Sequence, residues 1–147
     1  MDKFNYLFPL TSRKNRRTIG NKAKSLLALQ DKGVRVPETY VCSWKAYQHY
    51  LDNDITVVDQ LRQELAVTME PDAVYVVRSS ANIEDQFEQS FAGQFKSVLD
   101  VQNADAALQA IWSIWATARS DAVKAYLKKM MPSKVDLKMA VIVQKMV

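Results

Sequence analysis

Residues 73–80 read Ala-Val-Tyr-Val-Val-Arg-Ser-Ser, and this stretch decides the fold class that the sequence predicts. Its first five residues form an unbroken apolar run rich in β-branched side chains, which is typical of a strand buried in a sheet. We expect the strand to deliver Arg78 at its end, because the segment from Ser79 to Gly93 is polar and reads as a long loop. Long ordered loops often carry function, so this junction is a candidate binding site.

Upstream of this strand, the sequence predicts helices separated by short extended segments. Thr18 is expected to cap a helix that holds Lys22 in its first turn and stops at Gly33. Residues 34–42 then read as an extended segment that ends in a short strand, and Ser43 is placed to cap the next helix. A further helical stretch carries apolar residues at helical spacing between Val58 and Met69.

Downstream, a strand is expected over residues 94–101, and Asn103 is expected to cap the clearest helix of the chain. Ser120 begins another helix, and the last apolar run, residues 138–147, is expected to be a strand. The mixture of helices and strands without a linker or repeat predicts one α+β (mixed α/β) unit over residues 1–147.

The composition excludes several classes of function. The chain of 147 residues has one Cys and one His, so it forms no internal disulfide, no multi-cysteine zinc site and little histidine-based catalysis. Its apolar runs fall short of a membrane span and its start lacks a signal-peptide pattern, so we expect a cytoplasmic protein without a membrane partner.

The net charge of +4 comes mainly from a basic cluster at residues 13–17. Such a cluster can meet phosphate, but a solvated basic loop is the favoured interpretation. Aromatic residues that would stack on bases are missing around it, so no nucleic acid partner is expected.

Three places could carry chemistry. Lys22 lies at a helix start, where backbone N–H groups and the helix dipole favour an anion, although a first-turn lysine is often merely solvated. Arg78 offers a planar fork for phosphate oxygens, or an internal ion pair with Glu84 or Asp85. The small residues of the turn before Gln94 could let the backbone approach phosphate, or serve as a plain turn.

Taken together, these segments occur in the order of a known family. They are Gly-Asn-Lys-Ala-Lys-Ser-Leu (20–26), Val-Arg-Ser-Ser-Ala (77–81), Glu-Asp (84–85), Ser-Phe-Ala-Gly-Gln (90–94) and Val-Gln-Lys-Met-Val (143–147). The chain from residue 18 onward resembles the N-terminal nucleotide-binding domain of the phosphoenolpyruvate synthase and pyruvate phosphate dikinase family.

The resemblance implies the first subdomain of an ATP-grasp fold, in which two subdomains close on Mg-ATP. Phosphate then passes to a histidine on a swivelling domain and from there to pyruvate. By resemblance, Lys22 and Arg78 contact the ATP phosphates, and Gln144 lies near the adenine. Gly93, Ser97 and Val98 would line the phosphate loop.

The resemblance is incomplete in ways that matter for function. Asn21 stands where the family has a second glycine, and Ser97 stands where threonine is common. The Mg²⁺ ligands, the phosphohistidine domain and the pyruvate site are expected outside this chain, which holds no catalytic residue of its own. The chain alone is therefore expected to be inactive and to bind ATP weakly or undetectably.

Two other functions remain open. One is a related enzyme with another acceptor, such as a rifampicin phosphotransferase or a glucan-type dikinase, and the other is a stand-alone nucleotide-binding or interaction module. A terminal strand without partners would present unpaired N–H and C=O groups, so self-association through residues 139–147 is also expected.

Overall fold

The computed structural model describes residues 5–12, 16–83, 95, 97–130 and 136–147. The strands are β1 (Leu7–Pro9), β2 (Thr39–Cys42), β3 (Tyr75–Ala81), β4 (Val98–Val101) and β5 (Met139–Lys145). The helices are α1 (Gly20–Asp31), α2 (Trp44–Leu51), α3 (Thr56–Thr68), α5 (Ala104–Ala118) and α6 (Asp121–Met130). The predicted α+β class is confirmed, because these helices and strands combine in one unit around an antiparallel sheet.

The sheet has the strand order β1-β2-β5-β3-β4, so the strand that comes last in the sequence lies at its centre. Strand β5 pairs with β2 on one side and with β3 along its whole length on the other. Its backbone groups are therefore used inside the sheet. The premise of an unpaired terminal strand is wrong, and with it the reason to expect self-association through residues 139–147.

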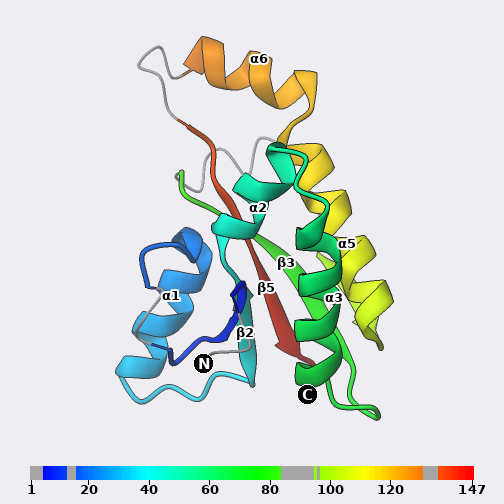
Figure 1. The fold of residues 1–147 in the computed structure, drawn as a ribbon. Helices are drawn as coiled ribbons and strands as arrows, with labels where there is room; N and C mark the ends of the chain where they lie inside the picture. The colour runs from blue at the N-terminus through cyan, green and yellow to red at the C-terminus, as the bar shows by residue number, and fades with distance from the viewer. Residues whose placement is uncertain (1–4, 13–15, 84–94, 96, 131–135) are drawn as a thin grey trace.

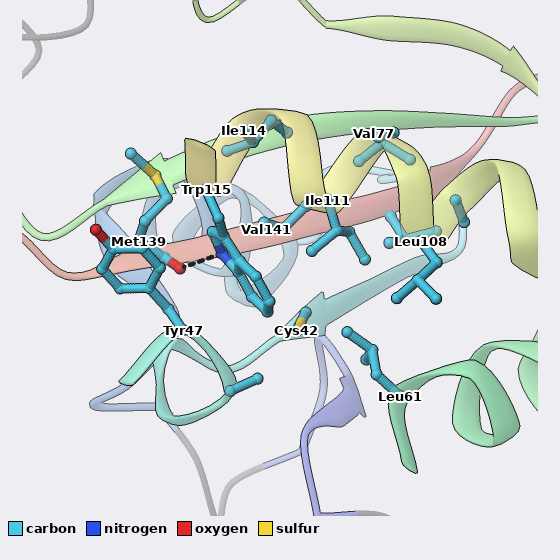
Figure 2. Packing of buried hydrophobic residues seen from close by; sticks show 14 of the residues in the cluster. Cys42, Tyr47, Leu61, Val77, Leu108, Ile111, Ile114, Trp115, Met139 and Val141 are labelled. Carbon is cyan, nitrogen blue, oxygen red and sulfur yellow. Dashed lines mark hydrogen bonds between the residues drawn. The ribbon is translucent and has the colours of Figure 1, made fainter. Parts of the chain in front are cut away.

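Helices cover both faces of the sheet, as Figure 1 shows: α3 and α5 lie on one side and α1 on the other. Side chains alternate along β5, so that Val141 and Val143 join the core under α5 while Ala140 and Ile142 pack under α1. The core on the α5 side is the larger. Figure 2 shows it around Trp115, whose indole N–H donates to the carbonyl oxygen of Met139 at 3.1 Å.

The predicted helix caps are partly confirmed. The Ser43 hydroxyl accepts from the N–H of Lys45, and the Asn103 side chain accepts from the N–H of Ala106 at 2.8 Å, so both residues are N-caps. Thr18, however, is not a cap. Helix α1 begins at Gly20, and its N-cap position is Ile19, which has no capping side chain.

Two strand boundaries differ from the prediction. Strand β3 does not stop at Arg78 but continues through Ser79 and Ser80 to Ala81, because β5 pairs with it over that length. Strand β4 is shorter than expected and covers only residues 98–101. Its pairing with β3 is irregular, and the backbone at Asp100 has a φ of 58°, which interrupts an even ladder.

Cys42 is completely buried, as its interpretation as a small core residue predicted. Burial raises the pKa of its thiol, and the nearby Glu64 raises it further. Within the ranges that the structure describes, no helix is long and apolar enough to cross a membrane.

Candidate functional site

The candidate site is built where the first turn of α1 rests on β3. Gly20 has a φ of +79°, and a Cβ at this position would overlap the carbonyl oxygen and the hydroxyl of Ser80. Only glycine allows this approach, since any other side chain would collide with backbone as well as adopt a left-handed conformation. The start of α1 is thus fixed directly against the strand.

The hydroxyl of Ser80 completes this junction with two hydrogen bonds. It accepts from the N–H of Ala23 at 3.1 Å and donates to the carbonyl oxygen of Ile19 at 2.7 Å. Ser80 is fully buried, so both bonds are shielded from water. Ser80, 57 positions after Ala23 in the sequence, therefore supplies the side-chain cap that Ile19 lacks. Asn21 adds a further tie, since its amide donates to the carbonyl oxygen of Ile83.

Arg78 lies two residues before Ser80 on β3, so strand alternation places it on the same face of the sheet as α1. Its partner in the ladder is Ile142, which packs under α1. Arg78 itself is half-buried. The structure thus brings Arg78 to the margin of α1, on the face where the first turn with Lys22 is anchored.

Gln144 occupies the neighbouring strand on that face. It pairs with Val76 and lies two residues after Ile142, the ladder partner of Arg78. The side chains of Gln144 and Ile142 therefore lie on the same face of the sheet. Its side chain is mostly buried, and its amide nitrogen donates to the hydroxyl of Thr39 at 2.9 Å. The Thr39 hydroxyl in turn donates to the carbonyl oxygen of Pro37 at 2.6 Å, so the orientation of the Gln144 amide is fixed.

Of the remaining predicted residues, the structure describes Ser97 and Val98, at the start of the edge strand β4. Val98 pairs with Val77, whose side chain belongs to the core under α5, so the register assigns Val98 to the face away from α1. Ser97 precedes it and is exposed. Gly93, like Glu84 and Asp85, falls outside the described residues.

Lys145 and Arg78 differ in whether they take part in ion pairs. Lys145, next to Gln144, is held by Glu70 at 2.7 Å, and this hydrogen bond raises the pKa of Lys145. Arg78 makes no ion pair with any residue in the described ranges. Lys22 is half-buried in the first turn of α1. Two cations on one face of a sheet can together offset the charge of a phosphate group.

A magnesium ion has no matching set of ligands in the described part of the chain. No three histidine, cysteine, aspartate or glutamate side chains gather there. The prediction that metal ligands lie outside this chain stays a prediction.

Sequence reasoning missed Ser80, which it assigned to a polar loop, and Thr39. The sequence held one indication that the strand extends to Ser80. Residues 79–92 contain neither Gly nor Pro, so nothing forces the strand to end at Arg78. The hydrogen bonds of Ser80, and the one that Thr39 accepts from Gln144, join residues far apart in the sequence and therefore leave no local pattern.

Comparison with known proteins gives a consistent result. The family model described as the pyruvate phosphate dikinase AMP/ATP-binding domain matches residues 55–147. The chain is 28% identical over 85% of its length to the uncharacterized phosphotransferase YvkC of Bacillus subtilis. It is 36% identical over 66% of its length to a probable phosphoenolpyruvate synthase of Pyrococcus abyssi, and 37% identical over 71% to the rifampicin phosphotransferase of Bacillus subtilis. The matched region spans only 12% to 17% of these relatives.

Proposed function

The chain belongs to the family of the pyruvate phosphate dikinase AMP/ATP-binding domain, and on that premise we propose that it forms the first half of an ATP site in which Lys22 and Arg78 bind the phosphates. One observation carries the proposal. The first turn of α1 is anchored on β3 through Gly20 and Ser80, so the helix start and Arg78 lie on one face of the sheet.

The physical chemistry of this face suits a triphosphate. A helix N-terminus favours negative charge through its dipole, and an arginine side chain can donate two parallel hydrogen bonds to phosphate oxygens. Gln144, held by Thr39, offers an oriented amide on the next strand, and we propose that it lies near the adenine. Gly93, Ser97 and the backbone of Val98 are proposed to approach the phosphates from the segment that leads into β4, since the register directs the Val98 side chain to the face away from α1.

We also propose that the chain acts as part of a larger phosphotransferase with an ATP-grasp architecture, whose other subdomain and phosphohistidine domain lie outside residues 1–147. Mg²⁺ would supply charge neutralisation for the triphosphate, with ligands elsewhere. We propose a cytoplasmic location as part of the same proposal, because a chain with one cysteine does not depend on an internal disulfide.

The acceptor is proposed to be pyruvate, as the phosphoenolpyruvate synthases among the relatives suggest. The rifampicin phosphotransferase is equally similar to this chain and supports a different acceptor as the alternative. The residues that choose between these acceptors are proposed to lie outside residues 1–147.

The proposal is tested by titrating the 147-residue chain with Mg-ATP in a calorimeter. The variants are Lys22→Ala and Arg78→Ala, and the matched controls are Lys24→Ala on the same helix and Arg35→Ala, both at exposed positions. Loss of one charged hydrogen-bonding partner is expected to weaken ATP binding about tenfold. The controls should leave the affinity unchanged.

Binding of ATP that is weak but saturable, and lost in Lys22→Ala and Arg78→Ala, would support the site. Equal weakening of ATP binding by Lys24→Ala and Arg35→Ala would mean that the binding is only non-specific attraction of an anion by a basic protein. No binding by a folded chain would mean that these residues alone do not form a site.

A further inference from the structure

A pocket lies on the opposite side of the sheet from α1, and the proposed ATP site does not use it. It has a volume of about 200 Å³ and is formed by the last turn of α2, the α2–α3 connection, the first turn of α3 and the last turns of α5. Its apolar lining belongs to or packs on the core under α5, except for Ile55 at the rim, which is 82% exposed. The lining residues are Tyr50, Asn53, Asp54, Ile55, Val57, Val58, Trp112 and Arg119.

Two aromatic side chains give the pocket a wall suited to a flat ring. The rings of Tyr50 and Trp112 meet edge to face, with centroids 5.2 Å apart and planes at 78°. Both are only half-buried. Val57 and Val58 supply branched aliphatic surface beside them. An aromatic ring bound here would gain apolar burial and an offset or edge-on aromatic contact.

The one carboxylate in the lining already has its own partners. Asp54 accepts from the N–H of Thr56 at 3.0 Å and from the Thr56 hydroxyl at 2.6 Å, and its other oxygen lies 3.3 Å from Nδ1 of His49. The hydrogen bonds from Thr56 also lower the pKa of Asp54. Both of its oxygens therefore already have partners within the end of α2 and the α2–α3 connection.

Arg119 is the cation of the lining. Its guanidinium carbon lies 5.5 Å from the centroid of the Tyr50 ring, and the side chain makes no ion pair with a residue in the described ranges. The position follows the last residue of α5, where a cation is favoured by the helix dipole. A guanidinium on the rim of an aromatic pocket can bind a carboxylate bidentately.

We propose that this pocket binds a small ligand made of one aromatic ring and one carboxylate, with the ring between Tyr50, Trp112 and Val58 and the carboxylate on Arg119. The volume fits one ring, because pockets for larger ligands usually measure about 300 Å³ or more. The ligand would sit on the far face of the sheet from Lys22 and Arg78, so it should bind with or without nucleotide.

The test compares three probes that share one ring: benzoate, benzyl alcohol and benzylamine. Each is titrated into the isotope-labelled chain without nucleotide, and backbone amide shifts are followed by NMR. Benzoate is expected to bind about fivefold more tightly than benzyl alcohol, the gain expected of one exposed charge pair. Its shifts should gather at residues 50–58, 112 and 119. Benzylamine should bind no better than the alcohol.

Two variants separate this site from general attraction of anions. Arg119→Gln should remove the preference for benzoate, while Arg35→Gln, at another exposed arginine, should keep it. Ile55→Glu places a carboxylate on the exposed rim and should weaken benzoate, whereas Ile55→Gln should not. Equal binding of all three probes, tightest binding of benzylamine, or no saturable shifts at the lining residues would overturn the proposal. So would a benzoate preference that survives Arg119→Gln.

Discussion

Replacing Gly20 with alanine is expected to separate α1 from β3, and Gly33 provides a matched control. The two glycines have nearly the same backbone conformation, with φ of +79° and +85°. An alanine at either position pays about 1–2 kcal/mol for a left-handed backbone. At Gly33 nothing lies within 4 Å of the added Cβ, so no steric cost is expected beyond that of the left-handed backbone.

At Gly20 the added Cβ overlaps the backbone of Ser80, which cannot move without disturbing the central ladder between β3 and β5. Helix α1 must therefore shift and give up both hydrogen bonds of the Ser80 hydroxyl, at about 1 kcal/mol each. Gly20→Ala is expected to cost about 3–4 kcal/mol in all, roughly 2 more than Gly33→Ala.

Urea unfolding followed by circular dichroism measures this difference. At a slope of about 2 kcal/mol/M, the midpoint of Gly20→Ala should fall about 1 M below that of Gly33→Ala. Adding Ser80→Ala to Gly20→Ala should not restore stability, since the backbone overlap remains. Equal midpoints for the two single variants would refute the close approach of α1 to β3.

Three further outcomes follow from the core and the caps. Asn103→Ala should lower the free energy of unfolding by about 1 kcal/mol through loss of the α5 cap, with Gln102→Ala as a neutral control in the same urea assay. Trp115→Phe should cost about 1–3 kcal/mol, because the buried carbonyl of Met139 loses its donor, and the loss is read from the urea midpoint. Burial raises the pKa of the Cys42 thiol, so the folded state keeps a proton that the unfolded chain releases above about pH 8.5. Stability should therefore fall as the pH rises past that value, and iodoacetamide should modify Cys42 only at the rate of unfolding; rapid modification of the folded chain at pH 9 would contradict this.

Local patterns in the sequence predicted the parts of the fold that depend on local physics. Asn103 was recognised because an N-cap bonds only three residues away, and the α5 face was recognised from the spacing of residues such as Ile111 and Trp115. The position of β5 in the sheet was not recognised. An apolar strand has the same pattern at the centre as at an edge, and its two neighbours come from β2 and β3, far apart in the sequence.

The candidate site, too, could be predicted from the sequence only where local patterns indicate it. Lys22 and Arg78 could be selected because their charges stand beside a helix start and a buried strand. The junction between α1 and β3 could not be predicted, because it depends on a contact between Gly20 and Ser80, which are 60 positions apart in the sequence. The pocket at Arg119 left no sequence pattern either, since its wall comes from three separate elements.

The central place of β5 has a consequence for synthesis on the ribosome. The first two strands pair with each other, and so do the third and fourth, but only β5 joins the two pairs. Until residues 139–145 have left the exit tunnel, the edges of β2 and β3 that β5 later covers have no partner, and two-stranded ribbons are marginally stable in water. These edges therefore stay unpaired in the nascent chain until β5 is available. Chaperones that bind extended apolar segments would act during that time.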